Sequence, residues 1–389
     1  MNRYLVIAAL AACNWTTFDD LQQSTWVDSQ KVPSGVGSTD YALAIAPLSG
    51  TGSAGSLAVL SGNAAWYSQL DFDAKGNASN GYSSALADDN VTQLAPQPLF
   101  VADDTGNFAL VQSGDISTPI SIVYGPAAGP LSVAQAFPGS ADAATFVKTS
   151  LVIASGQSLI TVTFNSGGAM AQTMTCMAED PSGMAVAGIA AIGTDATVDN
   201  SPLYAWTTDG KLLSFALPLS SMPACLATAT IFTATGFQPA PGSRLFAYDG
   251  HAVLVGVDTN SNGQVFVADT TMTAMSGAAA LSVTGLASST LGGMGTSGEF
   301  FLALGYPNRA VNGVTSGQVE LYNYEQTKGT LGAGVAETLE NAEPANGQLF
   351  GRDLAVMPYN GVGVLAVSAH AELFVYYQTL EYPDDTRQH

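Results

Sequence analysis

Three oxygen-bearing side chains at alternate positions have the spacing of a metal-binding loop. Asp258, Asn260 and Asn262 match the first half of an EF-hand-like calcium loop, with glycine at the sixth position. Calcium takes about six to eight oxygen ligands, but Gln264 and two apolar residues stand where a bidentate carboxylate should follow. The same segment joins two apolar runs, where a β-hairpin needs an Asn-Gly turn. We favour the hairpin turn, with calcium as the alternative.

Histidines and nucleophiles do not form a recognisable catalytic set. The histidines are His251, His370 and His389, and a catalytic triad needs one of them beside an activated serine or cysteine and an orienting acid. The nucleophile-elbow motif G-x-S-x-G does not occur in the sequence. His251 and His370 both follow predicted turns, and His389 lies on a terminal tail, so we do not expect an enzyme.

Paired carboxylates could instead catalyse glycoside hydrolysis, in which two acids meet across a cleft whatever their distance in sequence. Nothing in the local sequence distinguishes such a pair. A carbohydrate-active hydrolase or lyase is therefore an alternative, and three aspartates are the residues to test for it: Asp103, Asp104 and Asp115.

The N-terminal residues have the pattern of a short export signal. Arg3 precedes an apolar run at 4–12, which is shorter than the roughly 20 apolar residues of a transmembrane helix. The block LAAC at 10–13 resembles the bacterial lipobox. The resemblance implies that Cys13 is diacylated and becomes the first mature residue, so that the membrane holds the protein through lipid only. An ordinary signal with an incidental cysteine and a misassigned start codon are the alternatives.

A lipobox also indicates the cellular compartment in which the protein would lie. The protein would lie in the bacterial cell envelope, as an outer-membrane lipoprotein or in the periplasmic or extracellular space, and Asn14 lacks the charge that favours inner-membrane retention. Such a compartment is oxidising, and Cys176 and Cys225 remain as an even pair once Cys13 is set aside. We predict a disulfide between them. Two separate buried thiols are the alternative.

The composition favours strands and limits the partners. Charged residues make up only 11% of the chain, whereas long helices usually carry many Lys, Glu and Arg side chains on their exposed faces. Ten Lys and Arg residues stand against 31 Asp and Glu residues, for a formal net charge of -21. Such a surface repels polyanions, so we do not expect nucleic acid or anionic lipid headgroups as partners.

A pattern of short strands recurs along the chain. In the best-formed unit the sequence predicts strands at 353–357, 364–368 and 372–377, separated by short turns. Similar units recur about every 40 to 60 residues, the spacing of propeller blades. We therefore expect an all-β fold, a single β-propeller of about seven blades, each a short antiparallel sheet packed on its neighbours. The units are Tyr41–Leu70, Pro98–Tyr124, Ala141–Phe164, Gly183–Leu217, Ser243–Asp269, Leu291–Tyr324 and Phe350–Tyr377.

The last three units resemble FG-GAP repeats, the blades of the integrin-α-like propeller. The matching residues are Phe350 and Gly351 at the start of a unit, the apolar strand and turn at 302–307, and the Gly-led strand at 317–322. The resemblance implies a binding or adhesion propeller. The family's calcium loop, D-x-[DN]-x-D-G, lacks most of its acidic ligands in this sequence, so we do not expect calcium at that position.

Two segments match the dinucleotide-binding motif G-x-G-x-x-G, one from Gly50 and one from Gly293. A dinucleotide site needs that motif to open a helix, whereas both segments run into apolar strands. They fall at the same turn of their units. We interpret them as repeat turns and expect no cofactor.

These observations predict a signal peptide at 1–12, a polar tether at 13–34, the β-propeller at 35–378 and a tail at 379–389. A propeller usually closes its ring with strands from both chain ends, so part of Ser24–Ser29 is expected to pair with the last blade. We expect a binding or adhesion module for protein or polysaccharide. An envelope assembly scaffold is a second possibility, besides the enzyme.

Overall fold

The structure is a computed structural model in which most of the C-terminal two thirds of the chain is described. The predicted signal peptide, Cys13, Asp103, Asp104, Asp115, Asn260 and the predicted tail lie outside the described residues. Those described are 26–31, 42–48, 56–61, 66–72, 78–85, 99–102, 107–112, 120–126 and 132–137, then 139–378 except 166–169, 196, 199, 220–223, 259–261, 294–299, 342–343, 360–361 and 371.

Every regular element of these residues is a β-strand, and the strands form seven sheets of four or five strands and one two-stranded hairpin. The first sheet contains β2 (Ala42–Leu48), β3 (Ser56–Ser61), β4 (Trp66–Phe72) and β5 (Ala78–Ala85). The second contains β6 (Leu99–Ala102), β7 (Asn107–Gln112), β8 (Ile120–Pro126) and β9 (Ser132–Phe137). The third contains β10 (Ala143–Val147), β11 (Ser150–Ser155), β12 (Ser158–Phe164), β13 (Met170–Glu179) and, at its outer edge, β17 (Ala224–Leu226).

The remaining sheets follow in chain order. The fourth contains β14 (Ile189–Gly193), β15 (Leu203–Thr207), β16 (Lys211–Phe215), β18 (Ala229–Ala234) and, at its outer edge, β22 (Met275–Gly277). The fifth contains β19 (Arg244–Tyr248), β20 (His251–Val257), β21 (Asn262–Asp269) and β23 (Leu281–Thr284). The sixth contains β24 (Ser288–Gly293), β25 (Phe300–Tyr306), β28 (Gln318–Glu325), β29 (Thr330–Leu331) and β30 (Glu337–Leu339), with the hairpin β26 (Ala310–Val311) and β27 (Val314–Thr315) beside it. The seventh contains β31 (Leu354–Tyr359), β32 (Val362–Ala369), β33 (Glu372–Gln378) and β1 (Trp26–Lys31).

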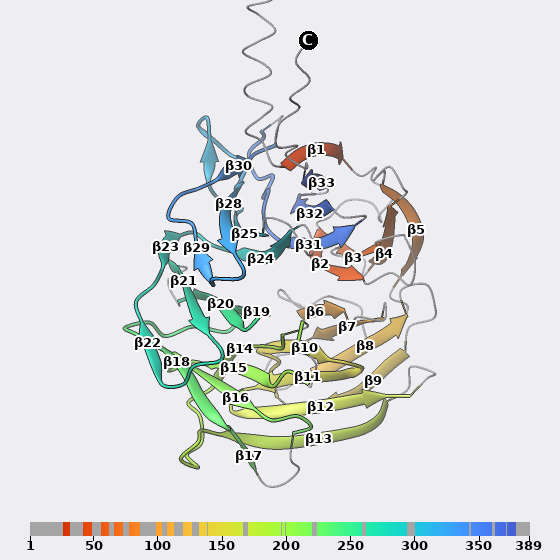
Figure 1. Ribbon diagram of the computed structural model, residues 1–389. Helices are drawn as coiled ribbons and strands as arrows, with labels where there is room; N and C mark the ends of the chain where they lie inside the picture. The colour runs from red at the N-terminus through yellow and green to blue at the C-terminus, as the bar shows by residue number, and fades with distance from the viewer. Residues whose placement is uncertain are drawn as a thin grey trace, which may run out of the picture.

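The sheets stand side by side about a common centre (Figure 1). The first strand of each sheet contacts the first strand of the next, in the order β2, β6, β10, β14, β19, β24 and β31, and β31 contacts β2 in turn. Neighbouring strands within a sheet run antiparallel, except that β17 and β22 join their sheets in parallel. Each of the seven predicted units supplies strands to one sheet, so the predicted all-β, propeller-like organisation is confirmed.

The N-terminal segment takes part in the last sheet. β1 pairs antiparallel with β33, with Trp26 opposite Gln378 and Lys31 opposite Phe374. The predicted pairing of this region with the last unit is therefore confirmed. Among the described residues the sheets begin with β1 at residue 26, inside the range predicted as a tether, because the last unit has only three strands of its own and β1 pairs with the open edge of β33.

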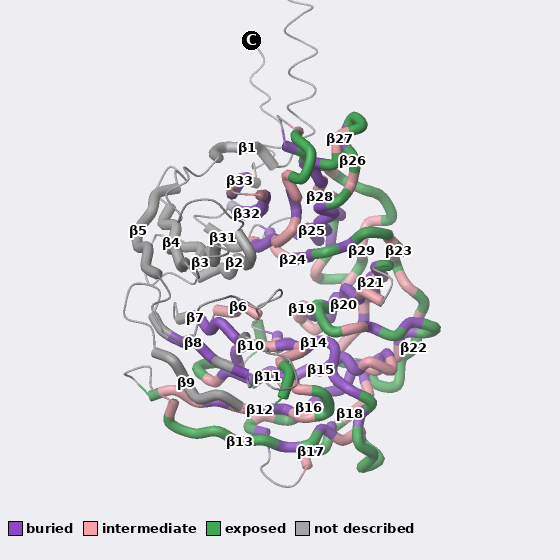
Figure 2. Tube along the Cα trace, turned by 180° about the vertical axis from the view of Figure 1, so that it is seen from behind, coloured by how far each residue is buried: buried purple, intermediate pink, exposed green. Residues whose placement is uncertain are grey.

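Continuous apolar runs form the middle strands of the sheets. All seven residues of β25 are buried, and β11 is buried from Leu151 to Ala154. A strand in the middle of a stack of sheets is covered on both faces, which is why its sequence lacks the alternation of a half-exposed strand. Seen from behind, buried residues concentrate in these middle strands and exposed residues in the loops and outer strands (Figure 2).

Short turns connect the strands within a sheet. Asp249 and Gly250 link β19 to β20 and have φ angles of 49° and 77°. Two successive residues with positive φ are the requirement of a type I′ hairpin turn, which Asp-Gly satisfies well. The turn brings two rigid strands to one end of the fifth sheet, where it also meets the fourth sheet.

Candidate functional site

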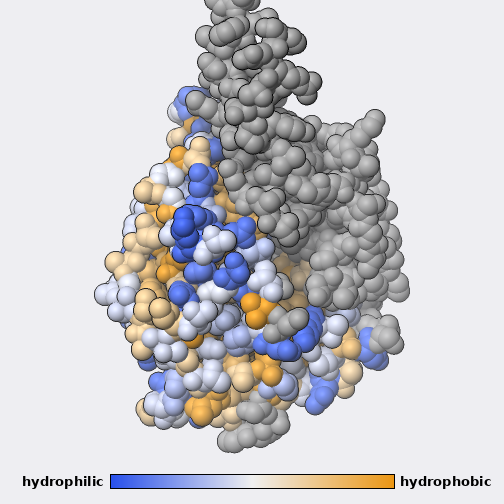
Figure 3. All heavy atoms as spheres, in the orientation of Figure 1, coloured by the Kyte–Doolittle hydropathy of each residue, from blue (hydrophilic) through white to orange (hydrophobic). Residues whose placement is uncertain are grey.

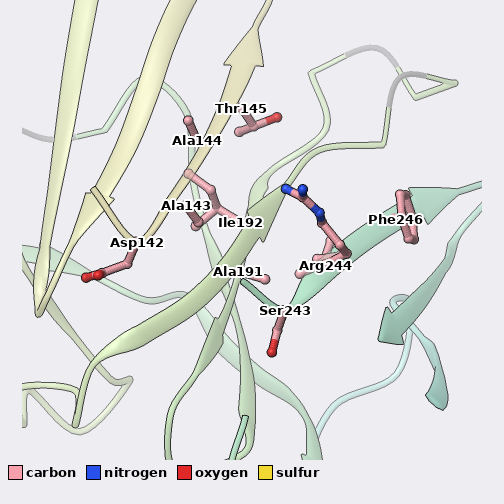
Figure 4. Close-up of a pocket in the computed structure, with 10 residues that line it drawn as sticks. Asp142, Ala143, Ala144, Thr145, Ala191, Ile192, Ser243, Arg244 and Phe246 are labelled. Atoms are coloured by element: carbon pink, nitrogen blue, oxygen red, sulfur yellow. The ribbon is translucent and has the colours of Figure 1, made fainter. Parts of the chain in front are cut away.

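A small cavity lies among the first strands of the third, fourth and fifth sheets. Its volume is about 170 Å³. We call the face on which β10, β14 and β19 begin the start face, and the face on which they end the end face. The lining residues come from the start of β10 and β19 and from the middle of β14: Asp142, Ala143, Ala144, Thr145, Ala191, Ile192, Ser243, Arg244, Leu245 and Phe246. Figure 4 shows these side chains around the cavity.

Arg244 is the cationic residue of this cavity. It is the first residue of β19, its side chain is exposed, and its guanidinium projects between the strands (Figure 4). No acidic side chain of the described residues forms an ion pair with it. Other cations do have carboxylate partners: Lys211 with Asp209 at 2.9 Å, Lys328 with Glu325 at 2.6 Å, and Arg309 with Glu320.

The polar neighbours of Arg244 are mostly engaged elsewhere. The carboxylate of Asp142 points away from Arg244 in Figure 4 and accepts a hydrogen bond from the Gly156 amide at 2.6 Å. The Ser243 hydroxyl donates to the Ala240 carbonyl at 2.7 Å. The Thr145 hydroxyl makes only a long contact, at 3.5 Å, with the carbonyl of Phe146. The cavity therefore combines one positive charge with one weakly engaged hydroxyl.

The candidate metal loop closes a hairpin between β20 and β21. The Asp258 carboxylate accepts hydrogen bonds from the Asn262 amide N–H at 2.9 Å and from its side-chain Nδ2 at 3.1 Å, and the Asp258 amide donates to the Asn262 carbonyl at 2.9 Å. Both carboxylate oxygens thus bind Asn262, and Val257 pairs with Gly263, so the segment connects two antiparallel strands, with the Asn-Gly pair inside β21. In the described part of the chain, no three His, Cys, Asp or Glu side chains are grouped to hold a metal ion.

The predicted disulfide is present. Cys176 on β13 is bonded to Cys225 on β17, with the two Cα atoms 5.5 Å apart, and both side chains are buried. β17 belongs to the connection between β16 and β18, so the chain leaves the fourth sheet, pairs with the edge of the third, and returns. β22 joins the fifth sheet to the fourth in the same manner. The repeat pattern did not predict either cross-connection.

A buried carboxylate also links the fourth and fifth sheets. Asp195, which is 3% exposed, accepts hydrogen bonds from the amides of Thr197 at 2.9 Å and Gly250 at 3.0 Å. It therefore fixes the Asp249–Gly250 turn against the loop after β14. The sequence contained no local signal for it, because its partner Gly250 is 55 residues away.

The histidines have different surroundings. His251 lies at the end face, where its ring Nδ1 is 3.1 Å from the Asp249 carbonyl. The backbone amide of His370 donates to the Gln348 carbonyl at the start face. These two residues are in different sheets and at opposite faces.

Two tyrosines of the sixth sheet have altered acidity. Burial, followed by the hydrogen bond to Glu320, raises the pKa of Tyr322 to about 12. Burial, followed by the negative charges of Asp249 and Asp195, raises the pKa of Tyr324 to about 12. Both phenols are neutral over the physiological range, so they serve as packing groups.

The described surface is mixed in polarity. In the view of Figure 3, hydrophilic side chains cover much of the described face, and hydrophobic atoms gather at the lower rim, over the region of β13 and β17. Met177 and Leu226 on these two strands are 45% and 53% exposed. The described residues contain no helix that is long and apolar enough to cross a bilayer.

Comparison with known proteins establishes the fold alone. No protein-family profile matches the chain, and no curated protein sequence matches it. Among solved structures, the chain is similar to BBS1N, crystallised in complex with ARL6DN, with a TM-score of 0.53, 13% identity and coverage of 92% of this chain and 98% of that one. It is also similar to Raptor of Chaetomium thermophilum, with a TM-score of 0.55 and 11% identity, over 92% of this chain and 30% of that one. These structures are β-propeller-like, and the chain has that fold.

Proposed function

We propose that the seven sheets are the blades of one closed propeller, and that its repeats are of the FG-GAP type. The ring of contacts among the first strands supports closure, and so does β1, which completes the seventh sheet with a strand from the other chain end. A closed ring leaves the turns of all blades on two opposite faces. The start face and the end face are then the surfaces available to a partner.

We propose that the protein is a binding module for another protein. The observation that carries this is the architecture itself: rigid, cross-connected sheets that present loops at two faces, the usual position of binding residues on a β scaffold. The similar BBS1N structure holds a protein partner, which supports the same use of this fold. The cavity at the start face has a volume of about 170 Å³, which is too small for a drug-sized cofactor. We therefore propose binding without catalysis.

Site-specific photo-crosslinking in the intact envelope tests this proposal. Met184 is 66% exposed in the loop between the third and fourth sheets, on the start face, and Met272 is 52% exposed on the end face. A photoreactive residue at Met184 should crosslink to a discrete protein, while the same residue at Met272 serves as the matched control. Absence of a discrete adduct from both positions would contradict a protein partner.

We further propose that the protein is exported and lipid-anchored at the outer membrane through Cys13. The lipobox-like block at 10–13 and the acidic, disulfide-containing chain support this placement. Metabolic labelling with palmitate should mark the wild type and should fail on the Cys13→Ser variant. Equal labelling of the two would exclude Cys13 as the acylated residue.

A further inference from the structure

The start-face cavity contains a cation that the described protein does not neutralise. Arg244 projects into the space between β10, β14 and β19, whereas Asp142, the one acid among the lining residues, points away and binds the Gly156 amide. From this arrangement we propose that the cavity binds a small oxyanion, a carboxylate or a phosphate, on the guanidinium of Arg244. The site is independent of any protein partner and goes beyond the binding function proposed above.

Arg309, unlike Arg244, has an aromatic ring and a carboxylate among the described residues as partners of its guanidinium. Its guanidinium lies 3.8 Å from the centre of the Tyr306 ring, donates to Gln318 Oε1 at 2.9 Å and pairs with Glu320. That arginine is a structural group, with its charge and its donors used inside the sixth sheet. Arg244 keeps its planar set of donors available, and this geometry matches two oxygens of a carboxylate or phosphate.

A second donor lies on the opposite wall of the cavity. The Thr145 hydroxyl comes from β10, and in Figure 4 its oxygen is directed to the same side as the guanidinium. Its long contact with Phe146 leaves it able to turn toward a ligand. The hydroxyl of Ser243 is excluded from this role, because it bridges the Ala240 carbonyl and the Val257 amide.

The size of the cavity limits the ligand. A volume of about 170 Å³ has room for an anion of the size of acetate, phosphate or succinate, and it is below the roughly 300 Å³ at which drug-sized pockets begin. The other lining residues are mainly Ala, Ile, Leu and Phe, which add no competing charge. A nucleotide or a long sugar chain does not fit such a site.

The acidic character of the whole chain does not remove this attraction. The net charge is -21, but exposed charges farther than about 8 Å are largely screened at physiological ionic strength. A bound oxyanion would be in direct contact with Arg244 and so would be governed by that contact. The position of the Arg244 guanidinium, rather than the net charge of the chain, therefore decides the sign of the electrostatic potential inside the cavity.

Calorimetric titration of the full chain tests the proposal. Sodium phosphate and sodium succinate are titrated separately at constant ionic strength, so that general salt effects cancel. Saturable binding of either anion by the wild type is expected, and the anion that binds identifies phosphate or carboxylate as the preferred class. Arg244→Gln should weaken binding by about tenfold or more, as expected for loss of a charged hydrogen-bonding group.

Matched variants separate a local site from a general charge effect. Lys328→Gln removes the same charge at the end face, where Lys328 pairs with Glu325, and should leave the affinity unchanged. Thr145→Val changes only the hydroxyl and should weaken binding severalfold, even if Arg244→Gln folds poorly. Circular dichroism verifies the folding of each variant. No saturable binding of either anion, or equal affinities in the wild type and a folded Arg244→Gln variant, would overturn the proposal.

Discussion

Cys176 and Cys225 are joined by a disulfide between neighbouring strands of the third sheet, although the chain around Cys225 connects two strands of the fourth. Cys176 lies on β13, the outer strand of the third sheet, and Cys225 lies on β17, within the connection between two strands of the fourth. The bond closes a sequence separation of 49 residues. It therefore connects the third and fourth sheets at their outer edge. The contacts between the first strands connect these sheets only near the common centre.

Removal of this disulfide should destabilise the protein. The Cys176→Ala, Cys225→Ala double variant is expected to lose about 2–4 kcal/mol of unfolding free energy, because the cross-link restricts the unfolded chain. Urea denaturation measures the difference. Reduced wild-type protein is the matched control, since it keeps both sulfur atoms, and it should lose a similar amount. Unchanged midpoints for both samples would contradict a stabilising role.

Among the carboxylates of the described residues, Asp195 should be one of those whose replacement lowers the unfolding free energy most. Asp195→Ala removes a buried carboxylate and leaves the partly buried amides of Thr197 and Gly250 without their acceptor, so we expect a loss of about 2 kcal/mol in unfolding free energy. Asp269→Ala is the control. That carboxylate accepts from the Thr271 amide at 2.8 Å at an exposed turn, and its removal should cost less than about 1 kcal/mol. Equal losses would argue against the inter-sheet role of Asp195.

The protein should lose stability at alkaline pH through its sixth sheet. Tyr322 and Tyr324 have folded-state pKa values raised from 10.0 to about 12, so their contribution is complete below pH 10 and is lost as the pH rises toward 12. Urea unfolding measured across this range should show the decline. A stability that stays constant from pH 9 to about 12 would contradict it.

Two phenylalanine variants separate the contributions of these tyrosines. The Tyr324 hydroxyl has no hydrogen-bond partner among the described residues, so Tyr324→Phe should change stability at neutral pH by less than about 1 kcal/mol and should reduce the alkaline loss. The Tyr322 hydroxyl donates to Glu320 at 2.9 Å, so Tyr322→Phe should cost about 1 kcal/mol at neutral pH. The reverse order at neutral pH would show that these contacts are wrongly assigned.

The Asp258 hairpin should be stable without calcium. Because both carboxylate oxygens of Asp258 bind Asn262, a chelator should leave the melting temperature of the wild type unchanged. Asp258→Ala should lower the unfolding free energy by about 1 kcal/mol with or without added calcium. A melting temperature that rises with calcium in the wild type and not in Asp258→Ala would favour the metal site instead.

Strand positions could be predicted closely from the amino-acid sequence. The strands predicted at 364–368 and 372–377 match β32 at Val362–Ala369 and β33 at Glu372–Gln378. These predictions depend on apolar runs bounded by turn residues, which are local properties of the chain. The disulfide could also be predicted, since once Cys13 is set aside only Cys176 and Cys225 remain to pair.

The candidate site could not be predicted in the same way. Arg244 has an ordinary sequence context at the start of a strand, and its significance arises only when β10 and β14 come to lie beside it. The same holds for Asp195, whose acceptor role depends on the distant Gly250. The periodicity of the sequence does not predict which side chains from the three sheets will lie next to one another.

By itself, then, the sequence determined the class of secondary structure, the number of repeating units and the pair of cysteines, because each depends on neighbouring residues or on composition. Tertiary structure decided the rest: the pairing of β17 and β22 with neighbouring sheets, the pairing of β1 with the last sheet, and the cavity around Arg244. These features join residues that are far apart in the chain, and only the packing of one sheet against the next brings them together.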